Sequence, residues 1–366
     1  MSVTRTDLPD GNGQEITGTS GKDYIYGTNF RDIINGLGGD DTLNGKGGAD
    51  EVHGGSGNDY LYGGEGNDTL NGDGGNDIID GGNGNDVLNG GGGLDILDGG
   101  NGDDLLDSGG GSYNDLTGGA GNDTFIARWT DSIQGNNNFG SDYSGDIDTV
   151  DLTNIDLKLG IVDLPSNQSL IDFLANNVLE NYTFNADTGT FQFTLNQENS
   201  DFSIYNKNNY NSIDIENVEA IQLSPDQAGE VVSAMEGHEV TFDADGNKII
   251  KANYGIGTID GGDYQSVLLD TTDLFINIDN LIEIYQLIDF EQVSSDDTIF
   301  TFIEHKTSFT VTDGFGNTIN AENFDKIKVT EEHRDFFLYL DSIEYDPSDP
   351  DSELPEEILI QLNLMA

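Results

Sequence analysis

The stretch that decides the fold is Gly54-Gly55-Ser56-Gly57-Asn58-Asp59-Tyr60-Leu61-Tyr62, whose pattern recurs every nine residues from 18 to 107. This region divides into ten consecutive units without a gap. Position one is Gly in every unit, and position four is Gly in nine of them, with Phe30 as the exception. Position eight is always Ile, Leu or Val. Position six is always Asp, namely Asp23, Asp32, Asp41, Asp50, Asp59, Asp68, Asp77, Asp86, Asp95 and Asp104.

Each fixed position has a physical reason. Glycine tolerates backbone conformations with φ > 0, so positions one and four allow tight turns that aim carbonyl groups inward. The aspartate adds a carboxylate beside those carbonyls, and Ca²⁺ prefers such oxygen ligands. Positions seven to nine predict a short strand whose middle side chain is buried, while its two neighbours face the other way. Because one unit cannot bury a core, the units are expected to stack.

The pattern Gly-Gly-x-Gly-x-Asp-x-U-x, with U aliphatic, resembles the calcium-binding nonapeptide repeat of the RTX (repeat-in-toxin, hemolysin-type) family over residues 18–126. The resemblance implies a right-handed parallel β-roll in which two units form one coil. Ca²⁺ would lie between same-side turns, held by position-six carboxylates and turn carbonyls, with roughly eight to ten ions in a stack of this length. The expected ligands are Asp23, Asp41, Asp50, Asp59, Asp68, Asp77, Asp86, Asp95, Asp104 and Asp123, with Asp32 as a weaker ligand.

Two departures from the pattern matter. The segment Gly27-Thr28-Asn29-Phe30-Arg31-Asp32 lacks its second glycine and places a cation beside Asp32, so we expect no full site there. Residues 108–117 contain one extra residue, which puts Asp115 out of phase. Residues 118–126 restore the phase, with Phe125 at position eight, where it is expected to cap the roll. A flexible Gly-rich linker is the alternative, but a linker would not keep aliphatic residues in phase.

The composition limits the possible partners. The 366 residues include 69 acidic and 13 basic ones, which gives a net charge of −56. Ten Ca²⁺ would leave about −36, so binding to nucleic acid or to a bare anionic membrane is not expected. Cysteine is absent, which excludes disulfides and Cys–zinc sites. No apolar run approaches the length of a membrane span, so no transmembrane segment is predicted.

Beyond residue 145 glycine becomes rarer, and the sequence repeats at a longer period. Residues 211–223 match residues 317–329 at an offset of 106, and residues 148–151 are similar to residues 257–260 at an offset of 109. A stretch with apolar residues at helical spacing lies in each copy. We therefore predict a mainly β protein, in which the roll precedes two tandem, mostly β modules with one short helix each. The predicted segments are a lead-in (1–17), the roll (18–126), a connector (127–144), copy one (145–225), a linker (226–254), copy two (255–331) and a C-terminal tail (332–366).

The N-terminus lacks the apolar core of a secretory signal peptide. The RTX resemblance implies another route, an uncleaved C-terminal signal read by a type I secretion machinery. Residues 346–366, an acidic run followed by a short apolar stretch, are compatible with such a signal. They equally fit a final edge strand, and both readings can hold together. The expected location is therefore extracellular or at the cell surface.

Motifs for catalysis are not found. The patterns H-E-x-x-H, G-x-S-x-G and the P-loop are all missing, although abundant acidic pairs leave a carboxylate dyad open. The leading hypothesis is a non-catalytic, secreted protein of the cell surface or extracellular matrix, whose duplicated modules bind surface glycans or other copies of the chain. The alternative is a secreted Ca²⁺-dependent enzyme acting on polysaccharides (a lyase, epimerase or hydrolase), with its site in those modules. A third possibility is an accessory chain whose roll only aids secretion.

Overall fold

The structure is a computed structural model. It describes residues 2–9, 11–135, 147–158, 160–162, 168–195, 202–206, 208, 211–236, 239–252, 258–260, 267–272, 278–290, 298–303, 307–312, 318–343 and 345. The chain forms two compact units, of which the first comprises residues 1–185 and 190–227, and the second residues 186–189 and 228–366. Each unit is described by itself.

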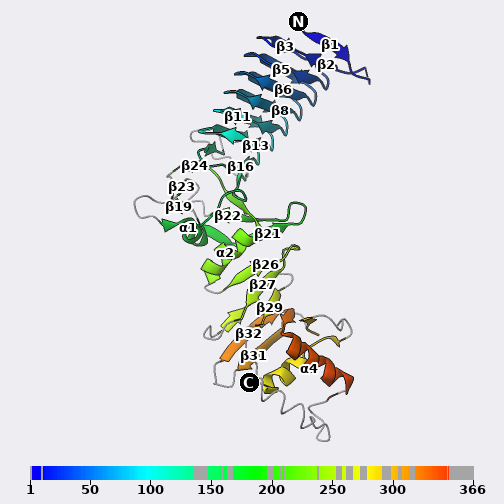
Figure 1. The fold of residues 1–366 in the computed structure, drawn as a ribbon, viewed down its shortest axis with the longest axis vertical. Coiled ribbons are helices and arrows are strands. Elements are labelled where there is room, and N and C mark those ends of the chain that lie inside the picture. Colours follow the sequence, from blue (N-terminus) through cyan, green and yellow to red (C-terminus); the bar gives the residue numbers. More distant parts are fainter. Residues whose placement is uncertain are drawn as a thin grey trace. The chain divides into compact units, whose positions relative to one another are not determined.

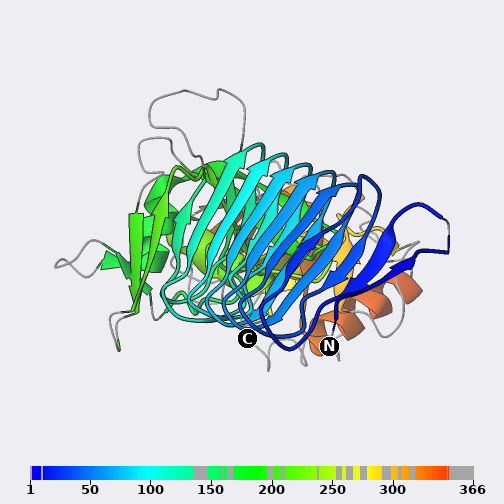
Figure 2. The same cartoon turned by 90° about the horizontal axis from the view of Figure 1, so that it is seen from above.

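The first unit is a stack of parallel strands in two sheets, joined by turns (Figures 1 and 2). One sheet contains, in parallel order, β2 (Gln14–Thr17), β4 (Ile33–Asn35), β6 (Glu51–Ser56), β8 (Thr69–Gly74), β10 (Val87–Asn89), β13 (Leu105–Asp107), β16 (Thr124–Ile126), β18 (Thr149–Asp151) and β25 (Ala220–Leu223). The other contains β3 (Tyr24–Tyr26), β5 (Thr42–Gly47), β7 (Tyr60–Glu65), β9 (Ile78–Asn83), β12 (Ile96–Asn101), β15 (Asp115–Ala120), β17 (Ser132–Gln134) and β24 (Ser212–Glu216). Two short strands, β11 (Gly92–Gly93) and β14 (Gly110–Gly111), pair beside the first sheet. This is the predicted parallel β-roll.

The core of the roll consists of the position-eight side chains. In one sheet Val52 is in register with Leu70, which is in register with Leu88, and all three are fully buried. In the other, Leu61 is in register with Ile79, and the burial is the same. The prediction that stacked aliphatic residues form the core is therefore confirmed.

The lead-in forms the N-terminal edge of the first sheet. β1 (Thr4–Asp7) pairs antiparallel with β2, and β2 pairs parallel with β4. Ile16 is in register with Ile34 and is fully buried, so it extends the position-eight column by one strand. The antiparallel β1 then covers the edge that a parallel stack would leave open.

Both sheets continue past residue 126, where the nine-residue pattern ends. Phe125 is in register with Val150, and Val150 with Ile221, so the expectation that Phe125 caps the roll is wrong. The successive position-six residues in this row are 18 or 19 residues apart up to Asp123, but then 25 and 71 residues apart. Insertions between coils hide the period, because a coil needs only its strands and turns to be in register.

Antiparallel strands end the first unit. β22 (Thr190–Leu195) pairs with β25 and with β21 (Val178–Asn185), and β23 (Phe202–Asn206) pairs with β24. β19 (Gly160–Val162), β20 (Gln168–Ser169) and helix α1 (Leu170–Asn177) complete it. The buried rings of Phe191 and Phe193 replace the aliphatic column here.

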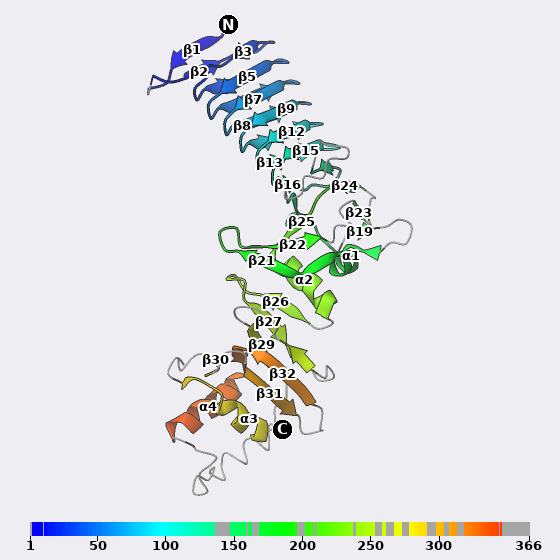
Figure 3. The same ribbon diagram turned by 180° about the vertical axis from the view of Figure 1, so that it is seen from behind.

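The second unit has two sheets (Figure 3). The five-stranded sheet has the order β26 (Val240–Phe242), β27 (Lys248–Lys251), β29 (Val267–Asp270), β33 (Lys326–Lys328) and β30 (Ile299–Thr301). The three-stranded sheet has the order β28 (Thr258–Asp260), β32 (Thr318–Phe324) and β31 (Thr307–Thr312). Helices α2 (Pro225–Glu236), α3 (Ile278–Tyr285) and α4 (Glu331–Ser342) accompany them. The segments expected as linker and tail thus contain α2, β26, β27 and α4, and residues 346–366 lie outside the described part. No helix in the described ranges is both long enough and apolar enough to span a membrane.

The duplication is visible, with a corrected register. β24 and β32 correspond at the offset of 106, and the equivalent residues Asn217, directly after β24, and Asn323, near the end of β32, both have φ > 0 (53° and 61°). The predicted match of residues 148–151 with residues 257–260 is wrong. At the offset of 106, β25 corresponds to β33. β18 pairs with β25 just as β29 pairs with β33, so β18 corresponds to β29 and not to β28. Asp151 therefore corresponds to Asp270. Within the described residues, each copy carries one short helix, α1 or α3, as predicted.

Candidate metal centre

The eleven aspartates predicted as ligands lie at the turns, each directly before a strand. They form two rows, as the spacing predicts. One row contains Asp23, Asp41, Asp59, Asp77 and Asp95, and the other contains Asp32, Asp50, Asp68, Asp86, Asp104 and Asp123. That these aspartates bind calcium remains a prediction.

In ten of the eleven aspartates, from Asp32 onward, one carboxylate oxygen joins neighbouring coils. Oδ1 of Asp41 accepts a hydrogen bond of 2.7 Å from the backbone N–H of Asp23, and Oδ1 of Asp59 accepts one of 2.7 Å from Asp41. The same bond recurs down both rows. A position-six side chain therefore satisfies a backbone donor that the sheets do not use.

The other oxygen has no partner in nine of these residues. Oδ2 is buried and without a hydrogen bond in Asp41, Asp50, Asp59, Asp68, Asp77, Asp86, Asp95, Asp104 and Asp123. A buried carboxylate oxygen without a donor is costly, since its hydration is lost without replacement. A bound cation would remove this cost at each of the nine oxygens.

For eight of the nine, Asp41 to Asp104, Oδ2 and a carbonyl oxygen of the next coil lie close to the same position-one residue. A Cβ atom at Gly36 would lie 2.5 Å from Oδ2 of Asp41 and 2.5 Å from the carbonyl oxygen of Gly54, one coil further. At Gly63 the corresponding atoms are Oδ2 of Asp68 and the carbonyl oxygen of Gly81. In the nine units with an unpartnered Oδ2, a side chain at position one would clash with these oxygens, so that position is Gly, whereas Ser108 holds it in the unit of Asn114. Carboxylate and carbonyl oxygens suit Ca²⁺, so the donor set fits this ion.

Burial without a cation raises the pKa of these carboxyl groups. Desolvation is the main cause, while the hydrogen bond from the preceding coil partly offsets it. The pKa rises to about 6 for Asp41, Asp50 and Asp86, to about 7 for Asp68, Asp77 and Asp104, and to about 8 for Asp123. The pKa of Asp59 and Asp95 is raised for the same reason. The fold thus disfavours the bare anions that it brings together.

Asp23 and Asp32, at the N-terminal end of the rows, differ from the other nine. Oδ2 of Asp23 accepts hydrogen bonds from the backbone N–H of Thr19 (2.6 Å) and from its hydroxyl (2.9 Å). Thr28 makes similar bonds to Asp32, from its N–H to Oδ2 (2.5 Å) and from its hydroxyl to Oδ1 (3.3 Å). The sequence singled out Asp32 for the nearby Arg31, yet the structure sets Asp23 apart as well.

Two cations near Asp32 have other partners. Arg31 forms an exposed ion pair with Glu51 at 3.4 Å. The ammonium group of Lys46 donates a hydrogen bond of 2.9 Å to the carbonyl oxygen of Gly27, the position-one residue of the Asp32 unit. At this end of the row, a lysine ammonium group therefore binds a turn carbonyl oxygen.

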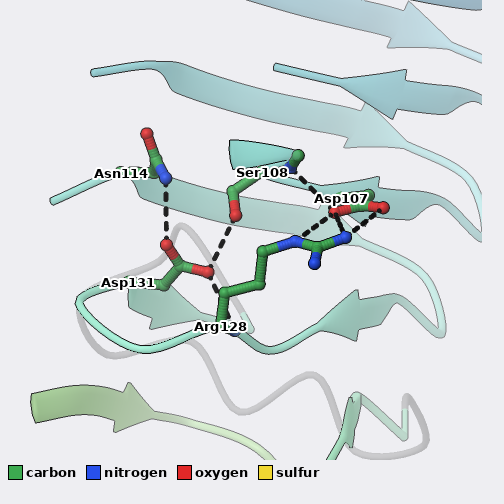
Figure 4. A network of polar contacts seen from close by, with 6 residues as sticks. Asp107, Ser108, Asn114, Arg128 and Asp131 are labelled. Atoms are coloured by element: carbon green, nitrogen blue, oxygen red, sulfur yellow. Dashed lines mark hydrogen bonds and ion pairs between the residues drawn. The ribbon is translucent and has the colours of Figure 1, made fainter. Parts of the chain in front are cut away.

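A polar network closes one row at its other end (Figure 4). Asn114 stands at position six, where its side-chain oxygen accepts the backbone N–H of Asp95 at 2.9 Å. Its amide donates to Oδ1 of Asp131 at 3.0 Å, and the hydroxyl of Ser108 donates to Oδ2 of Asp131 at 2.9 Å. Arg128 donates its backbone N–H to the same Oδ2 at 3.1 Å. Donors from the chain thus satisfy both carboxylate oxygens of Asp131.

The guanidinium group of Arg128 does not contact Asp131. It binds Asp107 through two nitrogens, each at 2.9 Å, in the bidentate geometry typical of Arg–carboxylate pairs (Figure 4). Asp107 in turn accepts the backbone N–H of Gly109 at 2.8 Å. This pair ties the loop that carries Asp131 to the preceding coil.

Sequence reasoning missed four position-six residues. Asn114, Asp131, Asp148 and Glu219 continue the rows, and Asp148 accepts the backbone N–H of Asp123 at 2.9 Å. The signal that could have found two of them is the second half of the nine-residue repeat, because residues 131–134 and 148–151 keep an Asp two residues before a buried aliphatic residue.

In the second compact unit, a lysine stands where the roll has a position-six aspartate. β27 aligns with β29 as β16 does with β18, so Lys248 corresponds to Asp123, and it pairs with Glu236 at 2.6 Å.

The comparison with protein families agrees with the geometry. The RTX calcium-binding nonapeptide repeat matches the chain in four copies, at residues 17–52, 45–79, 53–88 and 80–114. The resemblance stated above is therefore confirmed for this part of the chain, and repeats of this family bind calcium. The comparison with curated proteins finds no match to the chain.

Proposed function

We propose that this chain is a secreted calcium-binding protein whose roll folds when it meets extracellular Ca²⁺. The observation that carries the proposal is the set of nine buried Oδ2 atoms without a hydrogen-bond partner, arranged in two rows beside turn carbonyls. Bound Ca²⁺ supplies the positive charge that these oxygens lack. The family match supports secretion, because proteins with RTX repeats are typically secreted.

The chain's own residues prepare each site. The glycines let the turns approach one another closely, and the hydrogen bond to Oδ1 fixes the orientation of each carboxylate. The column of buried aliphatic side chains at position eight (the aliphatic ladder) holds the coils together but does not neutralise the charge of the aspartates. Folding and calcium binding are therefore coupled, as expected where the sites do not exist in the unfolded chain.

We further propose a non-catalytic role at the cell surface or in the extracellular matrix. The duplicated β modules support this, because repeated modules favour multivalent contact with a glycan or with other copies of the chain. His333 lies in α4, directly after the second module; it is buried, and burial lowers its pKa to about 4. Such a group is poorly suited to exchange protons near neutral pH.

The test is a Ca²⁺ titration of chelator-stripped full-length protein, followed by circular dichroism and light scattering on one sample. A cooperative gain of β-structure at roughly 0.1–1 mM, the range of extracellular calcium modules, is expected. A simultaneous rise in scattering would support assembly between copies. Folding without scattering would lead to a glycan-binding screen, with glycan cleavage followed in parallel. No spectral response would refute calcium-dependent folding.

A further inference from the structure

Position two of the repeat adopts two different backbone conformations. It has φ > 0 in the ten units that begin at residues 36 to 118, including the non-glycine residues Leu37 (75°), Lys46 (77°) and Asp73 (69°). Thr19 and Thr28, the position-two residues of the first two units, are not among the residues with φ > 0. A β-branched residue is strongly disfavoured in that region, which Thr130 (88°) nevertheless adopts elsewhere in the chain, so threonine at position two disfavours the conformation that glycine allows.

The threonines hold a different turn. The hydroxyl of Thr19 accepts the backbone N–H of Gly21 at 3.3 Å, and that of Thr28 accepts the N–H of Phe30 at 3.1 Å. In the later units the position-four N–H instead bonds to the next coil, as Gly39 does to the carbonyl of Ser56 at 2.8 Å. Short hydroxyl–backbone bonds of this kind compete with regular pairing.

The two turns leave the carboxylate in different states. With threonine at position two, its N–H points at the aspartate of the same unit, as Thr19 does to Asp23 at 2.6 Å. With φ > 0 at position two, Oδ2 of the aspartate is buried without a partner in all nine units that carry Asp at position six. The conformation at position two and the state of the carboxylate therefore change together along the roll.

We propose that the residue at position two decides whether a unit binds calcium. Glycine, or another residue held at φ > 0, leaves Oδ2 open for the ion, whereas threonine satisfies that oxygen from within the chain. The first coil, with Asp23 and Asp32, is then a metal-independent cap, and the calcium array begins at Asp41. This rests on the proposed function, because it assumes that the nine open oxygens are the calcium sites.

Two substitutions in opposite directions test the proposal in the full-length protein. Thr19→Gly gives the first unit the sequence Gly-Gly-Ser-Gly, as in residues 54–57, and should add one bound Ca²⁺. Leu37→Thr should remove one ion, because threonine would drive its turn into the closed conformation. Leu37 is 48% exposed, so the substitution removes no core side chain. Leu37→Gly, which keeps φ > 0 accessible, should retain the wild-type number.

The readout is the number of ions per chain at saturation, measured by equilibrium dialysis with metal analysis. Ser20→Gly, an exposed position-three change, controls for the added flexibility of glycine. One ion more in Thr19→Gly and one fewer in Leu37→Thr than in Leu37→Gly support the proposal. Equal numbers in the wild type, Thr19→Gly and Leu37→Thr overturn it. If Thr19→Gly does not fold, the two Leu37 variants decide. A wild type that binds no calcium refutes the proposed function itself, which is a distinguishable result.

Discussion

The backbone N–H of Asp59 donates a hydrogen bond of 2.8 Å to Oδ1 of Asp77, eighteen residues further along the chain. The same carboxylate buries its second oxygen without a partner. One side chain therefore serves two purposes, since Oδ1 fixes the stacking of coils and Oδ2 is offered to a cation. Substitutions can separate the two.

Asp77→Asn keeps a side-chain oxygen for the N–H of Asp59 but removes the charge. We expect a higher calcium concentration at the folding midpoint, because a neutral amide oxygen attracts Ca²⁺ less than a carboxylate does, and because the hydrogen bond from Asp59 loses its charged acceptor, a bond type that contributes about 1.5–3 kcal/mol. Asp77→Ala also removes the acceptor and should lower the unfolding free energy further, even at saturating calcium, by about 1–3 kcal/mol. Circular dichroism in calcium and urea measures both. Identical behaviour of the two variants would contradict the division of roles.

Asp59→Ala and Asp32→Ala compare a carboxylate whose Oδ2 has no hydrogen-bond partner with one whose Oδ2 accepts a hydrogen bond from the chain. Oδ2 of Asp59 has no partner, whereas Oδ2 of Asp32 accepts the N–H of Thr28. Asp59→Ala should therefore shift the calcium midpoint of folding more than Asp32→Ala does. Titration of both variants under one condition gives the answer. Equal shifts would show that Asp32 belongs to the calcium array after all.

Acid should stabilise the calcium-free roll. In the folded chain the pKa is raised to about 7 in Asp68 and to about 8 in Asp123, above that of an unfolded aspartate. At pH values between the unfolded and the folded pKa, the folded chain therefore binds more protons than the unfolded chain. Stability is then lost as the pH rises through the folded-state pKa. In chelator, the fraction of folded roll, followed by circular dichroism, should increase as the pH is lowered from 8 to 5. In saturating calcium this trend should weaken or reverse, because protons compete with the ion. A calcium-free roll that becomes more stable with rising pH would contradict the expectation.

Leu70→Ala tests the aliphatic ladder. Leu70 is fully buried between Val52 and Leu88, and its truncation leaves a cavity that the stacked strands cannot close. We expect a loss of about 2–5 kcal/mol in calcium-saturated protein, measured by urea unfolding. Thr69→Ala, on the exposed face of the same strand, is the matched control and should cost far less. Similar losses would mean that the ladder is not the main core.

Deletion of residues 346–366 tests the proposed route of secretion. If this segment carries a C-terminal signal, the shortened chain should remain in the producing cell yet still fold on Ca²⁺ in vitro. Export is followed by comparing the protein in medium and cells, and folding by circular dichroism. Undiminished export of the shortened chain would rule out this segment as the signal.

The sequence was sufficient for the regular part of the roll, from residue 18 to residue 107. Each nine-residue unit specifies its own turn and strand, and a strand such as β7 pairs with the equivalent strand eighteen residues away on either side. The parallel roll and candidate ligands such as Asp59 followed from the resemblance of that spacing to the RTX repeat, whereas the core column follows from the spacing itself. The same holds for the single helix in each C-terminal copy, where apolar spacing is again local.

Only the tertiary structure decided where the roll ends and which carboxylates remain open. β18 and β25 join the stack although 71 residues separate Asp148 from Glu219, because register in a sheet does not depend on the length of the chain between strands. The closure of Asp23 by Thr19 and of Asp131 by Asn114 likewise depends on where N–H and amide groups point in space. The sequence by itself determined the period and the chemistry of the ligands. The conformation of each turn determined whether a ligand oxygen was already satisfied.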